Sequence, residues 1–300
     1  MRDAPAPPGA PRSGPPGEWG GRPRALLLVV LVLAAGGAVA VAATGRSHPS
    51  TTTTARAAAS PAPTTAAPLV PVAPAVPQPN YAAVVARLAH KGAKVYCGSA
   101  HGNQVALTFD DGPGPRTRAI LRLLSQARMP ATFFLIGREV LAHPTLPRLE
   151  VRLGMALGDH TQTHPDLTRL SAPEVKAQLS GARDTIDAAS GVPVTLFRPP
   201  YGARNTHVDA QARALGLLEV LWDVDTRDSE RASAAKVAAN AQRGLRGGSI
   251  VLMHEDTATV KALPAILRSV RRRHLEAVTI PQLVAAGHRT KTCPYIPNTE

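Results

Sequence analysis

Residues 104–113 read QVALTFDDGP, an apolar run that ends abruptly in two aspartates, a glycine and a proline. A short apolar run bounded by turn residues is typical of a buried strand. Similar runs alternate with amphipathic stretches as far as residue 280, which predicts βα units around a parallel sheet or barrel. About seven such units fit this length, so we expect an α/β fold built as a small or incomplete barrel.

The predicted elements are short and follow one another closely. Strands are expected at Val105–Phe109, Ala131–Ile136, Met155–Leu157, Val194–Phe197, Leu218–Trp222, Ile250–Met253 and Ala277–Ile280. Helices are expected at Arg116–Arg128, Ala172–Ala189, His207–Leu215, Ala232–Leu245 and Val260–His274. Periodicity alone leaves the closure of the barrel open.

Polar residues gather just after the predicted strands, at the carboxyl ends where α/β proteins build their sites. Five stretches do so: 108–113 (TFDDGP), 159–165 (DHTQTHP), 198–202 (RPPYG), 222–228 (WDVDTRD) and 252–255 (LMHE). Because the strands are expected to be parallel, these stretches are predicted to form one site.

The second stretch indicates a metal site. His160 and His164 share a face only if the chain between them turns tightly, and Pro165 favours a single turn that ends at His164. Two imidazoles and one carboxylate, with positions left open, are the ligands of a hydrolytic metal site. The carboxylate is expected from Asp110 or Asp111, since adjacent strand residues point in different directions and the other can face the substrate water.

The five stretches match, in order, the motifs of the polysaccharide deacetylases of carbohydrate esterase family 4, and residues 104–287 resemble their NodB-like domain. The resemblance implies a distorted (β/α) barrel and metal-dependent hydrolysis of an acetyl group from an acetylated sugar. It makes Asp110 the general base. It makes Asp111, His160 and His164 the ligands of one divalent ion, usually zinc and sometimes cobalt or another metal.

The remaining motifs of the resemblance imply supporting roles. Arg198 would orient the base, and the backbone N–H of Tyr201 would stabilise the oxyanion. His254 would be the general acid, and Asp228 would tune it. Leu252 would line the acetyl pocket, although an apolar residue there could equally belong to the core.

Two positions depart from the family pattern. Ser229 stands where a tryptophan commonly follows the aspartate of the fourth motif, so one wall of the cleft is expected to be smaller or to be supplied from elsewhere. Asp159 replaces an asparagine before the first histidine, either as a support for His160 or as a surface substitution. Neither change removes a ligand, the base or the acid.

The first 80 residues have a different character. Residues 1–24 are expected to be a cytoplasmic tail, because arginines precede the uncharged apolar segment 25–43. That segment is either a transmembrane anchor or a cleaved signal peptide. Residues 44–80 are rich in Pro, Thr and Ala and are expected to form a disordered linker, and residues 81–300 the catalytic domain. Export is therefore expected, with the domain anchored outside the membrane or secreted.

Two features bear on partners. Cys97 and Cys293 stand near the two ends of the folded region, and in an exported protein they are expected to form a disulfide. The net charge is +13 for the chain and +9 for residues 81–300, where 28 basic residues face 19 acidic ones. Nucleic acid is not the expected partner, because stacking aromatics are scarce at 3%.

The sequence thus favours an exported polysaccharide deacetylase that acts on N-acetylglucosamine or N-acetylmuramic acid of peptidoglycan. Alternatives within the same chemistry are a chitin or chitooligosaccharide deacetylase and an acetylxylan esterase. A non-catalytic wall-binding module is a further alternative. The presence of both a base and an acid argues against it.

Overall fold

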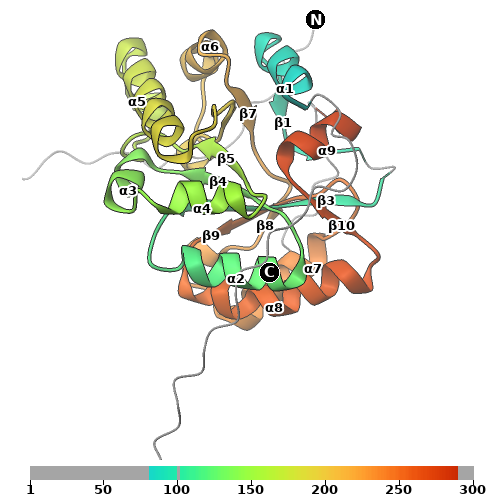
Figure 1. The fold of residues 1–300 in the computed structure, drawn as a ribbon. Coiled ribbons are helices and arrows are strands. Elements are labelled where there is room, and N and C mark those ends of the chain that lie inside the picture. The colour runs from blue at the N-terminus through green and yellow to red at the C-terminus, as the bar shows by residue number, and fades with distance from the viewer. Residues whose placement is uncertain (1–80, 100–101, 290–300) are drawn as a thin grey trace, which may run out of the picture. The chain divides into compact units, whose positions relative to one another are not determined.

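The computed structural model describes residues 81–99 and 102–289, which hold most of the predicted folded region (Figure 1). The predicted tail, the apolar segment 25–43, the linker 44–80 and Cys293 lie outside the described residues. Among the described helices, none is both long and apolar enough to cross a membrane.

The main sheet is parallel and is organised around β3 (Gln104–Gly112). β3 pairs with β4 (Thr132–Leu135) on one side and with β9 (Ile250–His254) on the other, while β10 (Glu276–Val278) pairs with its first residues. The remaining strands of this sheet are β1 (Lys94–Val95), β5 (Ala156–Asp159), β6 (Leu196–Phe197), β7 (Leu218–Val220) and β8 (Val224–Asp225).

The strand order is β1-β7-β6-β5-β4-β3-β9-β8. The path forms a curled half-barrel, which is consistent with the expected (β/α) barrel. Among the described strands, the two ends β1 and β8 do not pair with each other. A separate antiparallel pair joins β2 (Cys97–Gly98) to β11 (His288–Arg289).

Helices surround this sheet (Figure 1). They are α1 (Tyr81–His90), α2 (Thr117–Ala127), α3 (Gly137–Ala142), α4 (Leu146–Arg152), α5 (Ala172–Ser190), α6 (Thr206–Ala214), α7 (Ala234–Gly244), α8 (Thr257–Arg272) and α9 (Ile280–Ala286). Short 3-10 turns occur at η1 (Leu167–Arg169), η2 (Pro200–Gly202) and η3 (Asp228–Glu230).

All seven predicted strands and all five predicted helices are present, with ends displaced by at most three residues. The last predicted strand was extended too far, because Thr279 and Gln282 form a capping box that starts α9 at Ile280. The sequence missed α1, α3, α4 and α9, and also β1, β2, β8 and β11. The two-residue strands, and α3, α4 and α9 with six or seven residues each, are too short to show a period. α1 has ten residues, so its length does not explain why it was missed.

The two faces of β3 are both buried, and each serves a different purpose. Val105, Leu107 and Phe109 belong to the large core shared with α2, α7 and α8. Ala106 points to the opposite face, into a second apolar cluster with Phe134 and Ile250. Side chains alternate along a strand, so Asp110 shares the face of Ala106. This face of β3 therefore carries a carboxylate at the end of an apolar interior.

Leu107 is the residue at which the core can be tested. It is fully buried in the central strand, so we expect Leu107→Ala to lower the free energy of unfolding by about 2–5 kcal/mol. The exposed Leu141→Ala on α3 is the matched control, with an expected change within about 0.5 kcal/mol. Urea unfolding of the full chain measures both. Equal effects of the two substitutions would contradict the assignment of β3 to the core.

Candidate active site

Three predicted metal ligands converge at the carboxyl ends of β3 and β5. The ligand atoms of Asp111, His160 and His164 all lie within 4.8 Å of one another. Asp111 Oδ1 is 3.5 Å from His160 Nε2 and 3.3 Å from His164 Nε2. One carboxylate and two imidazoles this close suit a divalent ion such as zinc with positions left open. The described residues therefore fit the metal that the sequence implied.

Asp110 and Asp111 diverge because β3 is irregular at this point. The register of β3 against β4 shifts between Asp110 and Gly112, and Asp111 has a φ of 72°. A bulge of this kind redirects a side chain at a strand end. Asp110 is thus buried at 2% exposure, whereas Asp111 is turned out towards the two histidines.

The histidine loop differs from the single turn that we expected. Thr161 and His164 both have left-handed backbone conformations, with φ of 71° and 62°. The Thr161 N–H donates to Asp159 Oδ1 at 2.6 Å, and the His164 N–H donates to Thr161 Oγ1 at 2.9 Å. These two hydrogen bonds hold a non-helical bend that brings the imidazole centroids to 4.8 Å.

Asp159 is therefore not a surface substitution. Its side chain is fully buried, and burial raises the pKa of its carboxyl well above the ordinary value. Its contact with the N–H of Thr161 stabilises the loop between the two histidines. Of the two roles expected for Asp159, a support for His160 or a surface substitution, the structure favours the support.

His160 is held in the form that binds metals. Its Nδ1 lies 2.7 Å from the carbonyl oxygen of Arg198, which leaves Nε2 facing Asp111. Burial lowers the pKa of His160 to about 3, so the imidazole is neutral at physiological pH. A neutral imidazole with its second nitrogen hydrogen-bonded is the usual metal-binding arrangement.

Asp110 lies beside this cluster and is paired with Arg198. Arg198 Nη1 donates to Asp110 Oδ1 at 2.8 Å, and both side chains are buried. Burial raises the pKa of Asp110, although the Arg198 charge opposes this rise. Asp110 Oδ2 remains 3.8 Å from His160 Nε2, so this oxygen faces the predicted metal position.

His254 stands opposite Asp110 in the register of β3 and β9. Its Nδ1 lies 2.7 Å from Asp228 Oδ1, and its backbone N–H donates to Asp228 Oδ2 at 2.6 Å. Burial alone would lower the pKa of His254, but the hydrogen bond to Asp228 and the charge of Asp110 raise it to about 9. His254 is therefore protonated at neutral pH, as a proton donor must be.

The other predicted residues lie around this centre. Tyr201 is in a left-handed conformation in η2, and its ring packs edge-on at 4.8 Å from that of His164, with the side chain 71% exposed. Leu252 is buried in β9 beside Thr108, which is compatible with either of its two expected roles. Ser229 lies in η3, where its N–H donates to Asp228 Oδ1.

Several supporting residues were missed. Thr108 Oγ1 accepts from Arg198 Nη1 and donates to the Val251 carbonyl. The Arg198 guanidinium also lies 4.2 Å from the ring centroid of Phe134 and 5.7 Å from that of Trp222. Strand alternation could have found Thr108, two residues before Asp110, but no sequence signal places Phe134 against Arg198.

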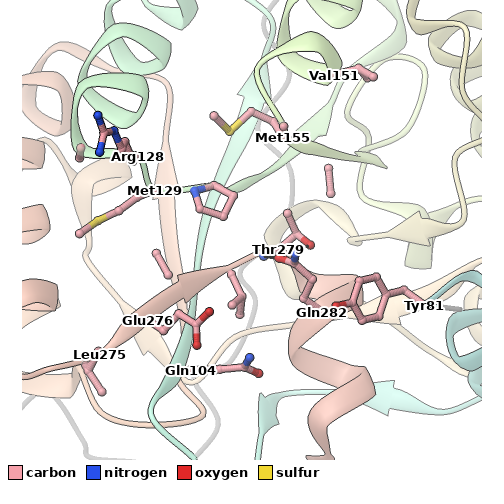
Figure 2. A pocket seen from close by; sticks show the side chains of 16 residues that line it. Tyr81, Gln104, Arg128, Met129, Val151, Met155, Leu275, Glu276, Thr279 and Gln282 are labelled. Carbon is pink, nitrogen blue, oxygen red and sulfur yellow. Dashed lines mark hydrogen bonds between the residues drawn. The ribbon is translucent and has the colours of Figure 1, made fainter. Parts of the chain in front are cut away.

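A cavity of about 800 Å³ lies elsewhere in the molecule (Figure 2). Its lining includes Gln104 and Glu276, the first residues of β3 and β10. The predicted site residues come from the opposite ends of the parallel strands, and none of them lines this cavity. The cavity is therefore not the candidate active site.

Asp228 controls the charge of His254 in this arrangement. We expect Asp228→Asn to lower the pKa of His254 from about 9 towards its ordinary range, because a neutral amide no longer stabilises the imidazolium. Titration of the histidine ring signals by NMR measures the shift. Glu230→Gln, two residues away and exposed, is the control and should leave the His254 pKa in place. An unchanged His254 pKa in Asp228→Asn would contradict this pairing.

Comparison with known proteins gives a consistent result. The family model described as polysaccharide deacetylase matches residues 98–220. A chitooligosaccharide deacetylase from Bradyrhizobium is 37% identical over 198 residues, which cover 60% of this chain and 90% of that protein. A solved structure of a family 4 carbohydrate esterase pseudoenzyme from Bacillus anthracis has a TM-score of 0.63 at 29% identity, over 66% of this chain and 71% of that one.

Other relatives are much longer than the matched region. A peptidoglycan-N-acetylglucosamine deacetylase from Listeria monocytogenes is 36% identical over 60% of this chain, but the match spans 38% of that protein. A bifunctional xylanase/xylan deacetylase from Cellvibrio japonicus is 37% identical over 59% of this chain and 27% of that protein. The converging site residues, the parallel half-barrel and the match over 90% of the length of a chitooligosaccharide deacetylase agree, and the chain belongs to the polysaccharide deacetylase family, that of carbohydrate esterase family 4.

Proposed function

We propose that this chain is an exported, metal-dependent polysaccharide N-deacetylase that acts on peptidoglycan. The observation that carries the proposal is the convergence of three metal-binding side chains with a buried carboxylate and a protonated histidine. Binding a metal alone requires neither of the last two groups. Their presence beside the ligands supports hydrolysis.

The residues divide the reaction between them. A divalent ion, zinc in the first instance, would be held by Asp111, His160 and His164, where it would polarise the acetyl carbonyl and acidify a water. Asp110 Oδ2 would take the proton of the attacking water, while Arg198 keeps Oδ1 occupied and fixes the carboxylate. The N–H of Tyr201 would donate to the developing oxyanion.

The second half of the reaction depends on His254. Its Nδ1 is committed to Asp228, so Nε2 is the nitrogen that would protonate the leaving amine. An amine is a poor leaving group unless it is protonated, so a histidine that holds its proton up to about pH 9 suits amide hydrolysis. Activity should therefore fall as the pH rises through this value, where His254 loses its proton.

The choice of peptidoglycan rests on the organisation of the chain. An apolar segment at 25–43 and a linker at 44–80 would hold the domain outside the membrane, within reach of the wall. A disulfide between Cys97 and Cys293 belongs to the same proposal, since exported proteins retain such bonds. A relative named for peptidoglycan N-acetylglucosamine supports this choice, whereas others are named for chitooligosaccharide and xylan.

A non-catalytic module is the competing function. Its basis is the structural likeness to a pseudoenzyme of the same family. In this chain Asp110 pairs with Arg198 and His254 pairs with Asp228, which supports catalytic roles for Asp110 and His254. We therefore favour an active enzyme.

Acetate release from purified peptidoglycan tests the proposal. The full chain is assayed with added zinc or cobalt and, separately, with chelator. Chitin oligosaccharides and acetylated xylan are assayed in parallel as alternative substrates. We expect metal-dependent release from peptidoglycan. Asp110→Asn should lower the rate by about 10²–10⁴-fold, because it removes the general base while preserving its shape.

Asp184→Asn, an exposed carboxylate on α5, is the matched control and should retain the full rate. Release from chitin oligosaccharides or xylan alone would overturn the choice of substrate. No release from any of the three, in a protein that binds metal, would instead favour the non-catalytic module.

A further inference from the structure

Three neighbouring helices share an unusual charge distribution. α2, α7 and α8 together contain eight basic residues and no acidic residue. All eight are exposed: Arg118, Arg122, Lys236, Arg243, Lys261, Arg268, Arg271 and Arg272. We call this set the basic face.

Of the remaining helices, α9 is uncharged, α1 adds only Arg87 to the basic count, and the other four are balanced. α3, α4, α5 and α6 together carry six basic and six acidic residues. The excess positive charge of the helices is thus not spread evenly over them. It is concentrated on one group of helices.

These helices form one continuous surface. α8 packs against both α2 and α7. Figure 1 shows the three helices together on one side of the sheet, with α5 and α6 on the other. Arg271 fixes part of this arrangement, since its Nη2 donates to the carbonyl oxygen of Ala127 at the end of α2. On α8 the basic residues run from Lys261 to Arg272, which extends the basic face over about 17 Å of helix.

The charge of the basic face is uncompensated within the described parts of the chain. Of the other arginines whose side chains are described, seven have an ion pair with a carboxylate and eight have none; Arg138–Glu139, Arg183–Asp184 and Arg246–Asp223 are examples of the pairs. None of the eight residues of the basic face has such an ion pair among the described residues. A long stripe of unpaired positive charge attracts an extended polyanion.

We propose that the basic face binds a linear phosphate polymer that carries no nucleobases. Guanidinium groups can donate two parallel hydrogen bonds to a phosphate, so the arginines of the basic face suit such a polymer. The absence of any aromatic residue from α2, α7 and α8 removes the stacking contacts through which single-stranded nucleic acids are bound. The basic face would thus hold the domain on a phosphate-rich matrix, independently of the catalytic centre.

Salt-dependent binding of the full chain to fluorescent inorganic polyphosphate tests this proposal. The variant Arg122→Gln/Arg268→Gln removes two charges from the basic face. The matched control, Arg152→Gln/Lys176→Gln on α4 and α5, removes two exposed charges from the balanced helices. Both variants have the same net charge, so a difference between them reports the location of binding.

We expect the basic-face variant to bind on the order of tenfold more weakly at low salt, with a log–log salt slope smaller by about 2. The control should keep the slope and lose no more than about twofold. Equal losses in the two variants would overturn the proposal, because binding would then follow net charge alone. Tighter binding of a single-stranded oligonucleotide than of polyphosphate would overturn it in favour of nucleic acid.

Neither readout uses acetate release. A failure of this binding test therefore leaves the proposed deacetylation untouched, and an inactive enzyme leaves the binding test valid.

Discussion

The buried ion pair between Arg198 and Asp110 is the constraint on which the site depends. A buried charge is costly unless it is fully partnered, and the Arg198 guanidinium donates to Asp110, to Thr108 and to the carbonyl oxygens of Val220 and Leu221. The carbonyl oxygen of the same arginine accepts a hydrogen bond from His160 Nδ1 and so orients the imidazole ring. One residue from the loop after β6 therefore holds both Asp110, the proposed base, and His160, a proposed metal ligand.

The two buried histidines show how position decides chemistry on this scaffold. For His160 the effect of burial outweighs the attraction of the Asp111 charge, so the pKa of its imidazole falls to about 3. His254 is also largely buried, but it bonds to the Asp228 carboxylate and its pKa rises to about 9. The same side chain is thus suited to binding a metal as a neutral imidazole at one strand end and to donating a proton at another.

Much of this site could be predicted from the sequence, because the chemistry lies in short motifs at strand ends. Parallel strands bring their carboxyl ends together, so Asp110, His160 and His254 could be placed at one edge without coordinates. The histidine loop was predicted less well. Its bend depends on left-handed residues and on a buried carboxyl at Asp159, and neither follows from periodicity or from Pro165. The stacking of Phe134 on Arg198 depends on tertiary packing alone.

X-ray absorption spectroscopy of the zinc-loaded full chain reports the ligands of the metal without requiring turnover. We expect a zinc shell of nitrogen and oxygen ligands with the scattering pattern of two imidazoles, reduced to one in His164→Ala. A shell without imidazole scattering, or one unchanged in His164→Ala, would contradict the assignment of Asp111, His160 and His164 as the metal site.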